Sequence, residues 1–440
     1  MSEAVMGAHA VGRWQNWART VTATPAGIVD VAREADIVAA VRYAGRHSLR
    51  VKALGSGHSY NDIADVGGAI GLAMSSHAGI ERVDGATGRV TVRSGTSLAV
   101  FCSELASRGL ALPVLGAITD QTVAGLVSTA THGTGRHAHS LSDAVVGLRF
   151  VDAGANVVDV SLERDPDLLD AARVGLGSLG ILSAVTFQCV PGYDLWLETR
   201  PVELEDAIAD LEVLQHADHF GFWWFPRTRW VVLRTAHRRA LDRSRPGRPP
   251  VAGRDPWHEA ALWCIGHTPA GTSIVNSMQR ALRFGRPRIV EGRWDEVFPC
   301  PGTMRQVGME YALPLEATAP ALESLRALFQ RHAVHAPVDV RFGAADQAWL
   351  SPSHGRRTCY IGVAVAQPFG RRIPYERLFR ALETVFARFG GRPHWGKMHT
   401  LDAARLAALY PRWRQFAEVR NQFDPARLFT NLHLHAVLGP

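Results

Sequence analysis

The segment VKALGSGHS, residues 51–59, joins a short apolar run to a glycine-rich turn and decides the fold class that we expect. The run at 51–54 predicts a strand, and Gly55 and Gly57 let the chain turn tightly after it. Such a turn exposes backbone N–H groups, which suit a pyrophosphate. The turn also presents His58, although a loop histidine is more often a surface or structural residue. The pattern therefore indicates a strand that ends in a phosphate-binding turn.

A second segment, LGAITDQTVAGLVSTATHGTG at residues 115–135, is rich in small residues and has Asp120 as its only Asp, Glu, Lys or Arg. Backbone of this kind packs closely against a large planar or phosphorylated ligand, or equally against a protein core. His132, His137 and His139 lie close together in sequence, but no cysteine or carboxylate stands at ligand spacing beside them. We therefore expect no metal site there.

The stretch GLGSLG, residues 175–180, matches the GxGxxG pattern of dinucleotide-binding proteins. That fingerprint follows a strand and opens a helix. Here a predicted helix at 165–174 precedes the glycines and a predicted strand at 181–190 follows them. The context disfavours an NAD site, although the glycines still allow backbone to approach a ligand closely.

Short strands and helices alternate from residue 20 to about 190 without a regular β-α-β succession, which predicts an α+β region. We expect Asp36 to cap one helix and Thr96 or Ser97 to cap the next. The predicted elements are strands at 27–32, 51–54 and 69–74, a hairpin at 81–95, and helices at 37–47 and 98–109.

The sequence changes character near Tyr193, where large aromatic residues become frequent. Alternating apolar strands and two predicted helices, at 203–216 and 320–332, indicate a second sheet that helices cover on one face. Pro320 suits the first turn of its helix. The apolar end of the chain should pack back on a domain. We expect three parts, at 1–190, 191–414 and 415–440.

Composition narrows the class of protein. The 440 residues are 47% hydrophobic and 20% charged, as in soluble globular proteins, and no apolar run reaches the length of a membrane span. The 48 basic and 41 acidic residues give a charge of +7. The arginines are spread along the chain, apart from a richer run at 238–250, so we expect no nucleic-acid partner. Only Lys52 and Lys397 are lysines, which suggests sites that need a compact ammonium.

The cysteines argue against a disulfide framework or a zinc cluster, because they are odd in number and contain no CxxC pair. We expect buried, reduced thiols. The first residues show no basic region followed by an apolar one, so a cytoplasmic location is the expectation. The five cysteines are Cys102, Cys189, Cys264, Cys300 and Cys359.

Taken together, the motifs resemble the aldonolactone oxidases, a family of vanillyl-alcohol-oxidase-type flavoproteins that act on L-gulono- and D-arabinono-1,4-lactone. The matches run in order from about residue 50 to 435, which makes the set more specific than any one motif. They are VKALGSGHS, the segment at 115–135, GLGSLGILSAVTF, PVDVRF with WLSP, GGRPHWGK and FDPARLFTNLHL.

The resemblance implies an α+β flavoprotein with a PCMH-type FAD-binding domain at 1–190, to which 415–440 returns, and a substrate cap domain at 191–414. His58 matches the histidine that bonds covalently to the flavin in the family. Gly116 matches a position beside the flavin where a small residue admits O2. The other implied FAD-binding residues are Gly55, Ser56, Gly57, Ser59, Thr119, Ser128, Thr131, His132, Gly133, Gly135, Gly177 and Gly180.

In the cap, Asp339 and Arg341 match a Glu-x-Arg pair that addresses substrate and flavin in relatives, with the acid shortened here by one methylene. Lys397 matches the family lysine near flavin N1 and O2. Hydride transfer to the flavin builds negative charge at that edge, so a cation there stabilises the transition state. The substrate hydroxyl must also lose a proton, for which Asp339, His394 and His399 remain candidates.

The resulting hypothesis is an FAD-dependent oxidase that converts the C2 alcohol of a sugar 1,4-lactone to a ketone and passes the electrons to O2. An alditol oxidase for xylitol or sorbitol and a lactone dehydrogenase with another acceptor remain open. A flavin-binding protein without turnover is the alternative from another class. The sequence leaves the oligomeric state unknown.

Overall fold

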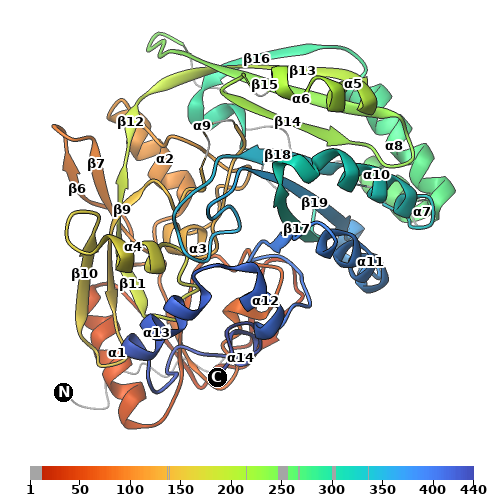
Figure 1. Ribbon diagram of the computed structural model, residues 1–440. Coiled ribbons are helices and arrows are strands. Elements are labelled where there is room, and N and C mark those ends of the chain that lie inside the picture. Colours follow the sequence, from red (N-terminus) through yellow and green to blue (C-terminus); the bar gives the residue numbers. More distant parts are fainter. Residues whose placement is uncertain are drawn as a thin grey trace.

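The structure of the chain is a computed structural model in which the N-terminal half and a large C-terminal sheet form two adjoining parts (Figure 1). The last helices, drawn in dark blue, return to the N-terminal part. The structure describes residues 12–135, 137, 139–214, 216–245, 256–265, 268–299, 304–334 and 336–440.

A three-stranded parallel sheet carries the turn at 55–59. Its order is β3 (Gly27–Asp30), β5 (Ile70–Ala73), β4 (Val51–Leu54). Helix α1 (Glu34–Arg46) covers it with an apolar stripe that begins at Ile37 and recurs at helical spacing. The predicted strands are confirmed, but Asp36 is not the cap. It is the third helical residue, and its carboxylate accepts the N–H groups of Ala32 and Arg33, both at 3.1 Å.

A five-stranded antiparallel sheet follows, and Ser97 caps α2 by accepting the Val100 N–H, as expected. The sheet order is β10 (Val157–Ser161), β9 (Val145–Val151), β11 (Ile181–Gln188), β7 (Arg89–Arg93), β6 (Ile80–Asp84). The remaining elements of this part are β1 (Trp14–Gln15), β2 (Thr22–Ala23), η2 (Asp62–Ala64), α2 (Leu98–Ser107), β8 (Leu110–Ala111), α3 (Val123–Ser128), α4 (Pro166–Arg173) and β12 (Val190–Pro191).

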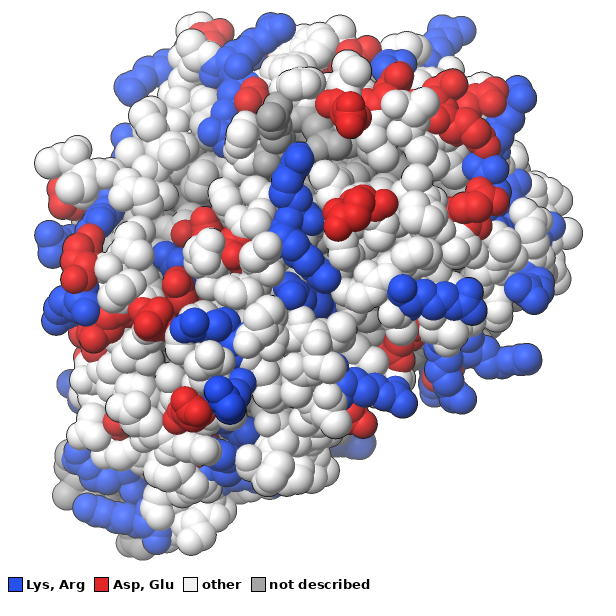
Figure 2. All heavy atoms as spheres, viewed as in Figure 1, with Lys and Arg blue, Asp and Glu red and all other residues white. Residues whose placement is uncertain are grey.

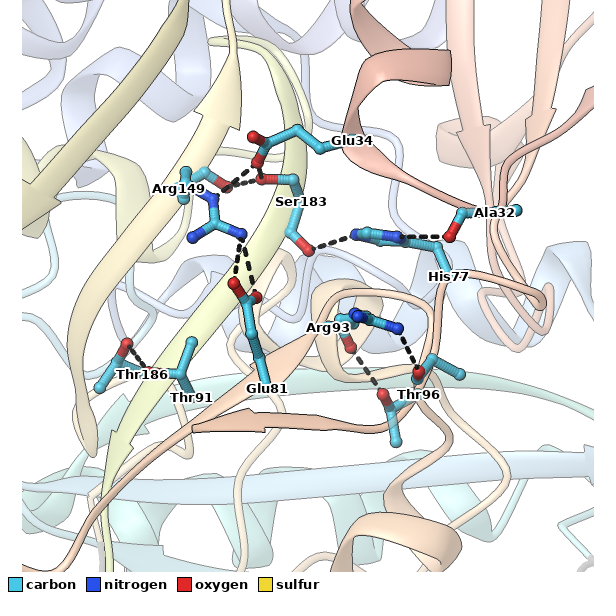
Figure 3. A network of polar contacts seen from close by, with 11 residues as sticks. Ala32, Glu34, His77, Glu81, Thr91, Arg93, Thr96, Arg149, Ser183 and Thr186 are labelled. Atoms are coloured by element: carbon cyan, nitrogen blue, oxygen red, sulfur yellow. Dashed lines mark hydrogen bonds and ion pairs between the residues drawn. The ribbon is translucent and has the colours of Figure 1, made fainter. Parts of the chain in front are cut away.

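A polar network joins α1 to the five-stranded sheet (Figure 3). The Arg149 guanidinium donates to Glu34 of α1 at 2.6 Å and to both oxygens of Glu81 at 3.0 and 2.9 Å. The Ser183 hydroxyl also donates to Glu34, at 2.6 Å. Burial raises the pKa of Glu34, but Ser183 and Arg149 together lower it below its usual value. The network thereby holds α1 against strands β9 and β11 of the five-stranded sheet.

The second half of the chain forms an eight-stranded sheet, as the aromatic-rich pattern predicts. Its order is β16 (Arg288–Arg293), β13 (Tyr193–Glu203), β15 (Trp230–Ala240), β14 (His219–Trp224), β18 (Val338–Gly343), β19 (Thr358–Ala366), β17 (Gln306–Pro314), β20 (Arg392–Pro393). The predicted helix at 320–332 is α10 (Thr318–Phe329), with Pro320 in its first turn. In place of the predicted helix at 203–216, the structure has two short helices, α5 (Leu204–Ala209) and α6 (Leu211–Leu214). Asp210 is the C-cap of α5 and separates them.

The two faces of the large sheet differ in character. Met309, Tyr311 and Leu313 of β17 point to the face that α10 and α11 (Glu376–Ala387) cover, and the Tyr311 ring stacks on Phe386 at 4.9 Å. The alternate residues point to the other face, which meets the N-terminal part through Thr134 and its hydrogen bond from Phe342 N–H at 3.1 Å. The other elements here are α7 (Pro256–Ile265), α8 (Pro269–Phe284), α9 (Trp294–Val297), η3 (Leu315–Ala317) and η4 (Pro368–Gly370).

The end of the chain packs on the parallel sheet, as its apolar sequence predicts. Val51 N–H donates to the Leu428 carbonyl at 2.9 Å, and the Asn431 side chain donates to the carbonyls of Asp62, Ile63 and Asp65 at 2.9, 3.2 and 3.0 Å. The helices of this segment are α12 (Ala403–Leu409), α13 (Trp413–Phe423) and α14 (Leu432–Leu438).

Surface charge is mixed on the face seen in Figure 2, where basic and acidic side chains alternate. Among the helices of the described residues, none combines the length and apolarity that crossing a bilayer requires.

Candidate active site

Two loops that are far apart in sequence lie side by side at the junction of the two parts. Tyr60 N–H donates to the Gly396 carbonyl at 2.7 Å. The Asn61 side chain donates to the carbonyls of Trp395 and Lys397, both at 2.8 Å. The fold therefore joins the loop that carries His58 to the loop that carries Lys397, two residues that the sequence analysis assigned to one site.

His58 is partly buried, and its ring stacks on Trp17 with 5.3 Å between the centroids and 24° between the planes. Burial lowers the pKa of His58, while the Asp120 carboxylate raises it. The net effect favours a neutral imidazole, the form in which a ring nitrogen can act as a nucleophile. The stacking also fixes the direction of the ring.

The turn at 55–59 has the features of a phosphate-binding turn. A Cβ on Gly55 would come within 2.4 Å of the Thr122 hydroxyl oxygen, and Gly57 has a φ of +67° that favours glycine. Gly55 and Ser56 are exposed, so the turn offers backbone N–H groups to a ligand at the end of β4. Ser59 contacts the neighbouring loop, where a Cβ on Gly396 would lie 3.1 Å from its hydroxyl.

The segment at 116–135 runs beside this turn and is mostly buried. A Cβ on Gly133 would lie 2.4 Å from Val114, so this glycine is needed for packing within the protein itself. Gly135 N–H donates to the Phe342 carbonyl at 2.8 Å and so ties the segment to β18. The Thr131 hydroxyl bonds Gln121 at 3.4 Å, and Thr119 is partly exposed.

The GLGSLG turn lies next to the same segment, because Leu176 N–H donates to the Ser128 carbonyl at 3.3 Å. It joins α4 to β11, the reverse of a Rossmann turn, as predicted. A Cβ on Gly180 would meet Phe150 and the Val151 carbonyl at 2.6 Å, whereas Gly177, with φ +65°, has open space around it. The glycine-rich turns and the nearby cation Lys397 are a donor set that fits the phosphates and ring system of FAD.

A buried glutamate, Glu310 of β17, lies at the centre of the polar sheet face. Its two carboxylate oxygens meet His132 Nε2 at 3.0 Å and Lys397 Nζ at 3.0 Å. Burial raises the pKa of Glu310, but Lys397 and then His132 lower it well below its usual value, so the group is ionised. Glu310 is not among the site residues expected from the sequence, although it is the only charged residue in the strand QVGMEYALP.

Asp339 and Arg341 of β18 occupy the same polar face. The Asp339 carboxylate accepts two hydrogen bonds from the Arg341 guanidinium, one of them from Nε at 2.7 Å. The Arg341 side chain is largely shielded from solvent, which lowers its pKa, but Asp339 and then Glu310 raise the pKa overall. Asp339 lies opposite Gly362 of β19 in the strand register, and Gly362 lies opposite Glu310 of β17. The two acids therefore lie in one row across three strands.

The two candidate histidine bases differ in their surroundings. His394 lies near the Glu310 group, with its ring 6.0 Å from that of His132, and its Nδ1 accepts the Gly396 N–H at 3.1 Å. Burial, and then Lys397, lower its pKa to about 3. The His399 ring contacts Trp395 and His433 instead, and burial lowers its pKa to about 4. Both rings are therefore weak proton acceptors near neutral pH.

His132, Glu310 and His394 hold ligand-type atoms within 4.8 Å of one another, a grouping that the sequence analysis did not anticipate. The Glu310 carboxylate already faces two N–H donors, one of them the Lys397 ammonium. A metal ion would have to compete with that ammonium for the same oxygens, so the arrangement suits an ion-pair network better.

The comparisons with known proteins agree with this geometry. The sequence model of the D-arabinono-1,4-lactone oxidase family matches residues 185–437, and that of an FAD-binding domain matches residues 25–161. An L-gulono-1,4-lactone dehydrogenase of Mycobacterium tuberculosis is 37% identical, covering 97% of this chain and 99% of the relative. An L-gulonolactone oxidase of Mus musculus is 31% identical (97% and 98% covered), and an alditol oxidase of a Streptomyces species is 30% identical (96% and 98% covered).

Among solved structures, a solvent-stable cholesterol oxidase matches with a TM-score of 0.81 and 18% identity over 97% of each chain. A cholesterol oxidase from Brevibacterium sterolicum matches with a TM-score of 0.79 and 16% identity, covering 97% of this chain and 96% of the other. At these identities the likeness establishes the fold.

Proposed function

Because this chain belongs to the D-arabinono-1,4-lactone oxidase family, we propose that it is an FAD-dependent oxidase of sugar 1,4-lactones. The substrate loses hydride from C2 and the hydroxyl proton, and the resulting 2-keto lactone enolises to an enediol. The joined loops of His58 and Lys397 are the observation that carries the proposal, since they bring both family motifs to one place.

FAD, when bound, supplies the hydride acceptor, and the protein supplies binding and electrostatics. We propose that the turn at 55–59 holds the pyrophosphate and that His58 forms a covalent bond to the flavin. Ser128, His132 and the turn at 175–180 belong to the same binding surface. This assignment makes 1–190 and 415–440 the FAD-binding part and 191–414 the cap.

Lys397 and Arg341 supply positive charge where the substrate alkoxide and the flavin edge become negative. The low pKa values of His394 and His399 disfavour both rings as bases. We therefore assign loss of the hydroxyl proton to the electropositive pocket, in which Asp339 holds Arg341 in place and orients the substrate.

Gly116 supports O2 as the acceptor. A Cβ at this position would lie 3.4 Å from both the His132 carbonyl and the Thr131 methyl, which is ordinary contact. The protein itself therefore tolerates alanine there, and we propose that glycine keeps a path for O2. The 37% identity to a dehydrogenase makes a different acceptor the alternative.

The cysteines support a reducing compartment such as the cytoplasm, because Cys102, Cys189, Cys264 and Cys359 are free thiols. Cys102, Cys189 and Cys359 are buried, as expected, whereas Cys264 is exposed, so the expectation of a buried thiol is wrong there. Cys300 lies outside the described residues.

The proposal is tested by steady-state kinetics with L-gulono-1,4-lactone, D-arabinono-1,4-lactone and xylitol, each with O2 and with an artificial dye. We expect a lactone to exceed xylitol in kcat/KM by at least about a hundredfold, or roughly 3 kcal/mol, with one H2O2 formed per turnover. A higher value for xylitol would favour an alditol oxidase, and dye reduction without peroxide would favour a dehydrogenase.

A further inference from the structure

Glu310 has the environment of a group that organises other side chains. It is 1% exposed, and each carboxylate oxygen faces a different cationic or N–H-bearing side chain. Gly362 lies opposite it on β19, and a Cβ there would come within 3.0 Å of Glu310 Oε2. The neighbouring strand thus leaves room for the carboxylate to reach Lys397.

The His132 ring is fixed from three sides. Its Nδ1 bonds the Gly133 carbonyl at 2.9 Å, its Nε2 bonds Glu310 at 3.0 Å, and its plane stacks on Tyr360 at 3.5 Å and 14°. Both ring nitrogens therefore have an oxygen partner. The same carboxylate therefore orders His132 and Lys397 together.

The two lysines of the chain differ in burial and in their partners. Lys52 is 5% exposed and bonds only weakly to the Phe429 carbonyl, at 3.4 Å. Burial lowers its pKa to about 8, even though Asp424 raises it. Lys397 differs in both respects: it is partly exposed, and it has a carboxylate at 3.0 Å.

We propose that Glu310 is a positioning residue of this site: it holds the Lys397 ammonium in place through one carboxylate oxygen and anchors His132 through the other. The role rests on the proposed function only in that Lys397 is taken to face the flavin. Glu310 acts through Lys397 and is not assigned a contact with substrate.

Sulfite binding to the oxidised flavin tests the proposal without any lactone. Sulfite adds to the flavin through its own electron pair, and the negative charge of the adduct is stabilised by a cation beside the ring. We expect Glu310→Gln and Lys397→Met each to raise the sulfite Kd by about tenfold or more, equivalent to 1.4 kcal/mol. The double variant should match Lys397→Met within about twofold, because Glu310 has nothing left to position.

Glu383→Gln is the matched control. Glu383 is also a buried glutamate, but it lies on α11 and accepts the Thr400 N–H at 2.9 Å, on the helix-covered side of the sheet. The sulfite Kd of Glu383→Gln should equal that of the wild type. Flavin content and melting temperature are measured for every variant. Glu310→Asp keeps the charge on a shorter arm, and its Kd should lie between those of the wild type and Lys397→Met.

The proposal is overturned if Glu310→Gln leaves the Kd unchanged or lowers it, or if the effects of the two single changes add in the double variant. If Glu310→Gln alone loses flavin while the double variant retains it, the flavin content itself shows that Glu310 acts through Lys397. If the wild type binds no sulfite, the flavin midpoint potential of the same variants provides the readout. These outcomes are independent of whether a lactone reduces the flavin, which tests the proposed function separately.

Discussion

At the scale of single residues, the scarcity of lysine marks two positions with different roles. Lys397 lies on the polar sheet face with Glu310, whereas Lys52 lies under the returning C-terminal segment. The sequence alone indicates that both lysines occupy unusual positions. It does not distinguish their roles, because these depend on which acidic side chain the fold brings close to each ammonium.

Lys52→Met should stabilise the protein below pH 8. The folded-state pKa of Lys52 is lowered from 10.5 to about 8, so the folded state carries a cost for the buried charge at neutral pH. That cost is about 3 kcal/mol at most and disappears as the pH rises from 8 to 10.5, where both states lose the proton. Chemical denaturation at pH 7 and pH 10.5 measures it. A gain that does not change with pH would contradict this account of Lys52.

His58→Ala should release all of the flavin into the supernatant on acid precipitation, whereas the wild type retains it in the pellet. The reason is the assigned covalent bond between the neutral imidazole and the flavin. His47→Ala is the control, because His47 is exposed at the end of α1. If His58→Ala retains the same fraction of flavin in the protein pellet as the wild type, His58 does not form the covalent bond.

At the scale of elements, local patterns predict strands and turns better than caps and networks. The run into the turn at 51–59, the hairpin near residues 81–95 and the reversed glycine motif at 175–180 all follow from neighbouring residues. Asp36 was assigned as a cap because its type fits, yet the helix begins earlier and uses it at the third position. Glu310 was missed because its partners come from two distant segments.

Asn431→Ala should destabilise the fold by about 2–4 kcal/mol, because it removes a helix cap and leaves buried carbonyls without a donor. The Asn431 side chain accepts the Leu434 N–H at 2.8 Å and donates to three carbonyls around η2. Asn421→Ala, on the exposed face of α13, should change stability little. Denaturant unfolding measures the stability of both variants. Equal free energies of unfolding would mean that the C-terminal segment does not stabilise the turn and η2 that follow β4.

At the scale of the whole molecule, the site exists only because the parallel sheet, the eight-stranded sheet and the loop after β20 meet. The parallel sheet delivers the turn of His58, the large sheet delivers Glu310, Asp339 and Arg341, and the loop after β20 delivers Lys397. Sequence motifs identify most of these residues through their resemblance to a family. Their contacts with one another are a property of the assembled fold.

The most direct test of this account is an anaerobic titration of the purified, flavin-loaded protein with sugar 1,4-lactones, with xylitol as the comparison. A lactone should bleach the flavin absorbance stoichiometrically, and admitting air should restore the absorbance with formation of H2O2. Bound flavin that no lactone bleaches, or bleaching by xylitol alone, would contradict it.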